Sequence, residues 1–321
     1  MASQSQSKNG KGFEYACLNI FEKYLDNVNN TVFIENNESV IIAQKDYNNL
    51  LPELQEKMNK AAEAAVRIIS RLEPRLQNPI NGDKLRLTLQ PDKKGMKGDV
   101  RDLIAIRKDN NWEIGISCKH NHSAVKHSRL SKTLDFGDKW LGIPCSDEYF
   151  NRVSPIFNNL AKLRRQRKKW KEILNKDISV YVPILNAFIE ELNSLEQRYP
   201  SIVPQKFLSY LLGINDFYKV ISKDSKEVTQ VLAFSMYGTL NKSSDKIKPQ
   251  VKIPQLVLPT KFYDISYKNN SKNTIIATCD NGWAVSMRIH SASTLVEPSL
   301  KFDVNLVGIP PTLYTQFEPW R

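Results

Sequence analysis

The sequence has few of the features that mark secreted, membrane-spanning or disulfide-stabilised proteins. Its 321 residues include four scattered cysteines, Cys17, Cys118, Cys145 and Cys279, with no CxxC pair. A chain of this length can bury a large core without disulfides, so we expect reduced thiols and a cytoplasmic location. No apolar run approaches the roughly 18 residues that a membrane-spanning helix needs. The N-terminal stretch MASQSQSKNGKG lacks the apolar core of a signal peptide and is typical of a flexible start.

Acidic residues are also in short supply relative to basic ones. The chain has 34 Asp and Glu against 46 Lys and Arg, which gives a net charge of +12 and a pI near 9.4. A surplus of this size favours a polyanionic partner. Because the sequence gives no support for a membrane, nucleic acid is the expected partner.

Apolar residues at helical spacing predict helices over residues 12–26, 46–72, 178–198 and 203–212. A further helix is expected from Ser154, which would cap it, with Pro155 at the first helical position. Residues 123–133 could begin another helix. The helical pattern therefore covers much of the chain before Gly213.

Strand-like runs lie on both sides of these helices. Residues 85–89 alternate as a strand, and DLIAIRK (102–108) and WEIGISCK (112–119) predict a hairpin with KDNN as its turn. After Gly213 the chain reads as short strands separated by turns, and residues 241–255 read as a linker or exposed loop. The pattern predicts a mixed α/β protein.

The predicted hairpin brings two chemically important residues together. Asp102 stands at the head of its first strand and Lys119 near the end of its second, so both side chains are expected at one end of the sheet. An acid that holds a divalent ion and a lysine that stabilises phosphate charge are what a metal-dependent nuclease needs. A hard, oxygen-rich site of this kind suits Mg²⁺.

This arrangement resembles the PD-(D/E)xK nucleases, in which an acid is followed by a (Glu/Asp)-x-Lys triplet. Here the triplet is Ser117-Cys118-Lys119, with serine in place of the carboxylate. The resemblance implies that a further ligand comes from elsewhere. Glu14 on the first helix and the carbonyl of Cys118 are the candidates, and Asp99 competes with Asp102 as the primary ligand.

Longer stretches are similar to the HaeIII-type restriction endonucleases. They are GKGFEYACLNIFE, KGDVRDLIAI, EIGISCKHNHSAVKHSRLS, DFYKVI and RIHSASTLVEPSLKFDVNL. The resemblance implies a type II enzyme of a restriction–modification system that cuts duplex DNA bluntly at GGCC with Mg²⁺ and leaves 5′-phosphate ends. A palindromic target favours a homodimer. The cognate methyltransferase would act on the same site, with no stable complex expected.

The expected fold is a restriction-endonuclease-like mixed β-sheet core flanked by helices. We expect a catalytic core over residues 1–150, a basic helical segment over 151–213 and a strand-rich DNA-recognition module over 214–321. Candidate DNA-binding residues lie in two polar stretches and comprise His120, Asn121, His122, Lys126, His127 and Arg129 in the first, and Arg288, His290 and Lys301 in the second. Arginine is the commonest reader of guanine.

The run KLRRQRKKWK (162–171) places seven basic residues among ten. Two interpretations remain open for it, a solvated helix and a surface that binds phosphates without sequence preference.

Two other functional classes are weaker. A non-catalytic DNA- or RNA-binding protein would explain the charge and the serine at position 117. A methyltransferase would need a glycine-rich cofactor turn, and the chain contains no G-x-G-x-x-G motif.

Overall fold

The structure is a computed structural model that describes residues 2–26, 30–79, 81–96, 98–245 and 247–321. The chain folds into two compact units. Unit 1 comprises Met1–Ser123, Ile214–Leu256 and Thr312–Arg321, and unit 2 comprises Ala124–Gly213 and Val257–Pro311. None of the helices within these described ranges has the length and apolar character required to cross a bilayer.

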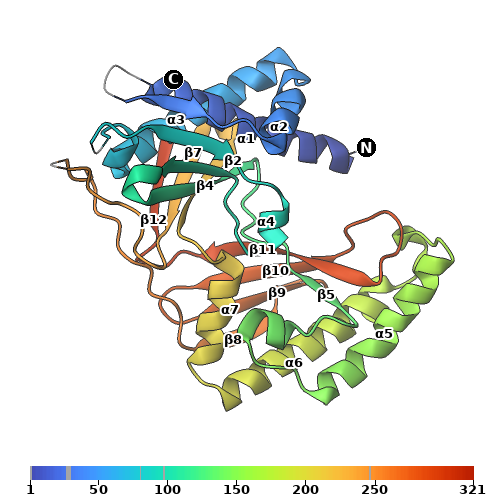
Figure 1. Ribbon diagram of the computed structural model, residues 1–321. Helices are drawn as coiled ribbons and strands as arrows, with labels where there is room; N and C mark the ends of the chain where they lie inside the picture. The colour runs from blue at the N-terminus through green and yellow to red at the C-terminus, as the bar shows by residue number, and fades with distance from the viewer. Residues whose placement is uncertain (1, 27–29, 80, 97, 246) are drawn as a thin grey trace. The chain divides into compact units, whose positions relative to one another are not determined.

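Unit 1 is built on a seven-stranded mixed sheet with the order β1-β2-β3-β4-β6-β7-β12 (Figure 1). The strands are β1 (Val32–Ile34), β2 (Leu85–Leu89), β3 (Leu103–Arg107), β4 (Trp112–His120), β6 (Phe217–Lys223), β7 (Val228–Phe234) and β12 (Tyr314–Pro319). The pairs β1–β2 and β4–β6 are parallel and the other neighbours are antiparallel. Two antiparallel groups, β2-β3-β4 and β6-β7-β12, are therefore joined by the parallel β4–β6 pair in the middle of the sheet.

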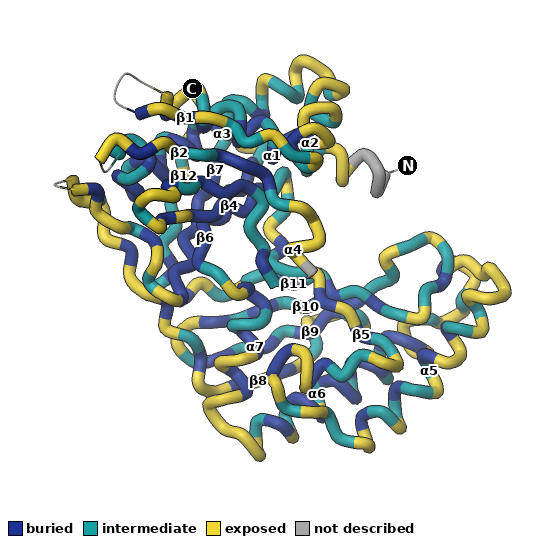
Figure 2. The backbone as a smooth tube through the Cα atoms, viewed as in Figure 1, coloured by how far each residue is buried: buried dark blue, intermediate teal, exposed yellow. Residues whose placement is uncertain are grey.

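The α-helices of unit 1 are α1 (Ala2–Leu25), α2 (Glu38–Asn48), α3 (Pro52–Leu72) and α4 (Lys93–Met96). Apolar residues of α1 and α3 pack against the central strands in one core, with Phe13, Phe21 and Ile68 fully buried. Figure 2 shows that β4 and β6 are buried along most of their length. The central strands that carry the site residues thus rest on a rigid, close-packed base.

Unit 2 contains a five-stranded antiparallel sheet with the order β5-β11-β10-β9-β8. Its strands are β5 (Arg129–Ser131), β8 (Phe262–Tyr267), β9 (Thr274–Cys279), β10 (Ala284–His290) and β11 (Ser299–Gly308), and its helices are α5 (Asp147–Arg165), α6 (Val182–Arg198) and α7 (Ile202–Leu212). Phe188 of α6 packs on Phe302 of β11, and Phe207 of α7 packs on Phe262 of β8. The helices and the sheet of unit 2 therefore share a core.

Short helical turns connect these elements. They lie at Pro74–Leu76, Lys108–Asn110, Gly137–Leu141, Trp170–Glu172, Asp177–Tyr181 and Asp224–Lys226.

The mixed α/β class, the strand at 85–89, the hairpin and the helices near 178–198 and 203–212 are confirmed. The predicted helix over 46–72 is wrong in its first turn, because α2 ends at Asn48 and Pro52 starts α3. A proline disfavours helical backbone in the residue before it, so the two helices stay separate. Helix α1 begins at Ala2, where a flexible start was expected.

The predicted start of the basic helix is also wrong. The N-cap of α5 is Ser146, whose hydroxyl accepts from the backbone N–H of Tyr149, and Pro155 lies inside the helix on its exposed side. The possible helix at 123–133 is wrong as well, because Arg129–Ser131 form β5.

The compact units differ from the three expected segments. Strands β6, β7 and β12 belong to the same sheet as the β3–β4 hairpin, although they follow Gly213 in the sequence. The physical reason is the parallel pairing of β6 with β4, which the local sequence pattern does not encode. Residues 241–255 contain no regular strand or helix in their described part, as a loop requires.

Candidate active site

Asp102 and Lys119 meet at one end of the unit 1 sheet. Asp102 immediately precedes β3, and its N–H donates to the carbonyl of Ile116 on β4 at 2.8 Å. Lys119 is the penultimate residue of β4, and its Nζ lies 3.1 Å from Oδ2 of Asp102. The convergence that the hairpin predicts is therefore present in the structure.

One carboxylate oxygen organises this end of β4. Oδ2 of Asp102 accepts hydrogen bonds from the backbone N–H of Cys118 at 2.7 Å, from Oγ of Ser117 at 3.2 Å and from Lys119. Ser117 thus contacts Asp102 directly and helps to fix the position of its carboxylate. Within the described residues Oδ1 of Asp102 receives no hydrogen bond, which leaves this oxygen able to bind a cation or water.

Glu14 supplies a second carboxylate from α1. It is 8% exposed, and Lys11 donates to it at 2.9 Å while also pairing with Asp92 at 2.7 Å. Burial and the negative charge of Asp102 raise the pKa of Glu14 to about 7. The two acids are therefore close enough to repel each other.

The charge of Lys119 is maintained by these acids. Burial alone would lower the pKa of Lys119, but the nearby carboxylates of Asp102 and Glu14 raise it above its ordinary value. The ammonium group is therefore protonated at neutral pH.

Two further lysines of this region escaped the sequence analysis. Lys219 of β6 lies beside Ser117 in the β4–β6 register, is 2% exposed and donates to the carbonyl of Ser123 at 2.5 Å. Burial and the positive charge of Lys119 lower the pKa of Lys219 to about 7. The only sign of Lys219 in the sequence was a lysine inside the apolar run FYKVI, and Lys11 lies in the stretch GKGF.

Asp99 has different partners. Both of its carboxylate oxygens accept from Arg101, at 2.8 Å from Nε and 2.8 Å from Nη2. Nη1 of Arg101 also donates to the carboxylate of Glu113 on β4 at 2.7 Å. Of the two aspartates weighed as the primary ligand, Asp102 is the one that contacts Lys119.

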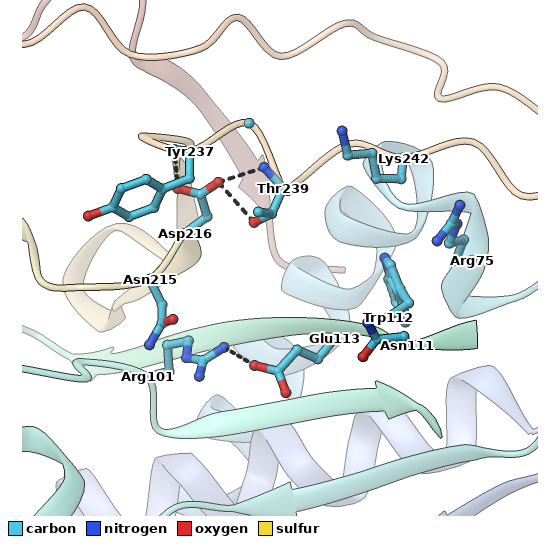
Figure 3. A pocket seen from close by; sticks show the side chains of 11 residues that line it. Arg75, Arg101, Asn111, Trp112, Glu113, Asn215, Asp216, Tyr237, Thr239 and Lys242 are labelled. Carbon is cyan, nitrogen blue, oxygen red and sulfur yellow. Dashed lines mark hydrogen bonds and ion pairs between the residues drawn. The ribbon is translucent and has the colours of Figure 1, made fainter. Parts of the chain in front are cut away.

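A cavity of about 680 Å³ lies at the other end of β4 (Figure 3). Trp112 and Glu113 line it, together with Arg101 and the loops before β6 and after β7. In those loops Asp216 accepts from the N–H groups of Tyr237 at 2.8 Å and Thr239 at 2.7 Å. Because β4 runs from Trp112 to His120, this cavity is separate from the Asp102–Lys119 pair.

The polar residues that follow Lys119 contact the turn between β6 and β7. Nε2 of His120 lies 2.9 Å from Asp224, and the amide oxygen of Asn121 accepts from the N–H of Asp224 at 2.9 Å. Burial alone would raise the pKa of Asp224, but hydrogen bonds from His120 and Ser222 lower it to about 2. His120 and Asn121 therefore stabilise this turn, and His122 follows them, partly buried.

In unit 2, three of the candidate DNA-binding residues surround one acid. Asp303 of β11 lies 2.7 Å from Arg288, 2.9 Å from His127 and 3.2 Å from His290. The side chain of Arg288 remains 56% exposed despite this ion pair. Asp303 thus brings Arg288 and two histidines together, Arg288 and His290 from β10 and His127 from the segment before β5.

The other candidates of unit 2 differ in accessibility. Arg129 is exposed, donates to Oγ of Ser299 at 2.9 Å and pairs with Lys301 in the β5–β11 register. Lys126 donates to the carbonyl of Tyr210 at 2.6 Å and lies over that ring, and burial lowers its pKa to about 8. Arg129 is therefore more accessible to a partner than Lys126.

In the described part of the chain, no group of three or more His, Cys, Asp or Glu side chains is arranged to hold a metal ion. The carboxylates of Asp102 and Glu14 are the two that raise the pKa of Lys119. Mg²⁺ is often bound through one or two carboxylates, with water and substrate phosphate completing its coordination. This donor set fits such an ion.

Comparisons with known proteins identify the family of this chain. No solved structure matches the chain significantly. The chain is 44% identical over 319 residues to the type II restriction enzyme HaeIII of Haemophilus aegyptius, and the match covers 99% of each chain. Residues 10–310 match the family described as HaeIII restriction endonuclease. With the match spanning nearly the whole chain, the protein belongs to the HaeIII restriction endonuclease family.

Proposed function

We propose that the protein is a type II site-specific deoxyribonuclease that hydrolyses duplex DNA at GGCC. The cut would be blunt and Mg²⁺-dependent, would leave 5′-phosphate ends, and would serve a restriction–modification system. The observation that carries this proposal is the 3.1 Å pairing of Asp102 with Lys119 in a chain of this family. The target sequence rests on the resemblance alone.

The proposed metal ligands are Asp102 and Glu14, with the carbonyl of Cys118 as a third donor. Type II restriction endonucleases generally use a divalent metal ion. Burial and the negative charge of Asp102 raise the pKa of Glu14 to about 7, and a cation between the two acids would relieve their mutual repulsion. When bound, it would act as a Lewis acid on the phosphate. Asp99 is a poorer candidate because Arg101 occupies both of its oxygens.

Lys119 is the proposed electrostatic catalyst. Its ammonium would donate to a non-bridging phosphate oxygen or orient the attacking water, and would stabilise the charge that develops on the phosphate. Asp102 fixes the position of this ammonium through their ion pair. Ser117 would act by fixing Asp102, since its hydroxyl donates to the same oxygen.

Sequence recognition is proposed for the accessible basic and histidine side chains of unit 2. Arg288 is the best candidate to read guanine through O6 and N7, and its ion pair with Asp303 would hold the guanidinium in place before DNA binds. His127, His290, Arg129 and Lys301 would contact bases or phosphates nearby. His120 and Asn121 would act mainly by shaping the loop that carries His122.

A palindromic target is most simply met by a two-fold homodimer with one active site for each strand. We propose this assembly, and we propose the cytoplasm as its location, where all four free cysteines would stay reduced.

Digestion of a plasmid of known sequence with Mg²⁺ tests the proposal. Mapping the ends should give a discrete ladder bounded by GGCC, with 5′-phosphates and no overhang. A ladder at another sequence or a smear would refute the GGCC specificity. Intact DNA would refute the proposed catalytic function and favour a DNA-binding protein. EDTA should abolish all cutting.

A further inference from the structure

The basic segment, residues 162–171, lies at the C-terminal end of α5 in unit 2. All seven of its basic side chains are exposed, namely Lys162, Arg164, Arg165, Arg167, Lys168, Lys169 and Lys171. Helix α5 ends at Arg165, and Arg167 adopts a left-handed backbone with φ of 57°. The segment is therefore only partly helical, and its last basic residues extend from a turn.

The backbone of this turn is fixed. The N–H of Trp170 donates to the carbonyl of Thr294 at 3.0 Å, and the N–H of Val296 donates to the carbonyl of Lys168 at 2.9 Å. The indole of Trp170 is 5% exposed and stacks on Tyr181. Figure 1 shows the end of α5 beside the loop between β10 and β11. The basic side chains thus stand on an anchored backbone, which lowers the entropy cost of binding a partner.

The charge of this segment is not balanced by ion pairs within the part of the chain that the structure describes. Among the described residues, none of the seven basic side chains forms an ion pair with an acid. The dipole of α5 favours cations in its last turn, which accounts for Lys162, Arg164 and Arg165. It does not account for the four basic residues beyond the helix end, since the dipole effect decays within a turn. A polyanionic partner explains both groups.

The position of the segment indicates which polyanion. Thr294, which pairs with Trp170, follows His290 by four residues, a separation of at most about 14 Å for an extended chain. The same loop leads from β10, which carries Arg288, into β11, which carries Lys301. The anchored end of the basic segment therefore lies within about one helical turn of DNA, roughly 34 Å, of the proposed base-reading residues.

We propose that the basic segment binds the phosphates of duplex DNA that flank the recognition sequence. This inference rests on the proposed function, because it places the recognition sequence against β10 and β11. The segment would add affinity that is independent of sequence and strongly dependent on salt. It would also help the enzyme to reach its target on long DNA.

The test compares two variants with equal loss of charge. The first replaces part of the basic segment, as Arg164→Gln, Arg165→Gln and Lys168→Gln. The control replaces three exposed lysines next to β8, an edge strand of the unit 2 sheet. The changes are Lys261→Gln, Lys268→Gln and Lys272→Gln. A third variant, Arg164→Lys, Arg165→Lys and Lys168→Arg, keeps the charge. Circular dichroism checks that each is folded.

Binding is measured without metal over a range of salt, on a duplex limited to the target and on one with long flanks. Each phosphate contact contributes about 0.9 to the slope of log K against log salt. We expect the first variant to lose about 2 to 3 from its slope on the long duplex and little on the short one. The control and charge-preserving variants should match the parent protein on both.

Equal slopes for all variants on the long duplex would overturn the proposal. So would weakened binding to anionic lipid vesicles with DNA binding unchanged, which would identify a membrane surface as the partner. Failure of the proposed function is detected separately, because it appears as uncut plasmid with the parent protein. The salt slopes are measured without cleavage and do not depend on that result.

Discussion

Replacement of Lys119 by methionine separates chemistry from folding. Methionine keeps most of the length of the side chain and removes its charge. At 3.1 Å the ion pair with Asp102 has a Coulomb energy of roughly 5 kcal/mol at an effective dielectric constant near 20. Desolvation and side-chain entropy offset most of this, and both side chains are about a fifth exposed. We therefore expect a loss of about 1–2 kcal/mol of stability, which a folded domain tolerates.

The effect on cleavage should be far larger. Removal of one preorganised donor from a developing oxyanion typically costs about 10²–10³ in rate, or roughly 3–4 kcal/mol. Single-turnover cleavage of a GGCC duplex with excess enzyme should fall by that factor. Metal-free DNA binding should weaken by less than about tenfold, since at most one phosphate contact is lost.

The control is Lys23→Met, which removes an exposed lysine from α1 of the same unit and should cut like the parent protein. A folded Lys119→Met protein that binds DNA and cuts within tenfold of the parent rate would refute the role given to Lys119.

Three further changes test the surroundings of the site and the core of unit 1. Ser117→Ala removes one hydrogen bond to Asp102 and should slow single-turnover cleavage by about tenfold at most; a loss as large as that of Lys119→Met would mean that the hydroxyl itself takes part in the chemistry. Burial raises the pKa of Glu73 to about 7, from an ordinary value of 4.5, so the folded protein holds a proton that the unfolded chain releases between these values. Stability should therefore fall by up to about 3 kcal/mol as the pH rises from 4.5 to 7, and urea titrations of Glu73→Gln should show a smaller fall; an unchanged pH dependence would contradict this. In Gly115→Ala the new Cβ would lie 1.9 Å from Cδ of Arg101, so we expect a loss of about 1–3 kcal/mol in urea denaturation, and an unchanged midpoint would show that Arg101 moves away at no cost.

The pairing of Asp102 with Lys119 could be predicted because its geometry is local. Asp102 and Lys119 belong to one hairpin, whose alternating β-branched strands and KDNN turn are written in a single continuous stretch. Lys219 could not be placed in the same way. Its position beside Ser117 depends on the parallel pairing of β4 with β6, two strands far apart in the sequence. Pairings of this kind are decided by tertiary packing.

The start of α5 shows how a strong local signal can mislead. Ser154 followed by Pro155 has the pattern of a helix start, but the buried residues Tyr149, Val153 and Phe157 continue the helical spacing upstream of it. Burial of that face outweighs the hydrogen bond that Pro155 cannot make. The serine that caps the helix is followed by two acids, a signal that was present in the sequence.

The surroundings of the candidate recognition residues could be predicted only in part, because they too depend on strand pairing. The alternation of Arg288 and His290 on one strand was visible, but the acid that holds both was not. Asp303 faces Arg288 through the antiparallel register of β10 and β11, and His127 joins them from a distant part of the sequence. The register of the β10–β11 pair across its long connection is not readable from composition.

The most direct test of the shared Asp102–Lys119 site is cleavage rate as a function of Mg²⁺ concentration. It should be measured for the parent protein, for Asp102→Asn and for Asp109→Asn, which alters an exposed aspartate in the β3–β4 turn of the same unit. We predict that Asp109→Asn follows the parent curve and that Asp102→Asn stays inactive at every Mg²⁺ concentration while remaining folded. Parent-like cutting by Asp102→Asn, with the same Mg²⁺ requirement, would contradict the account.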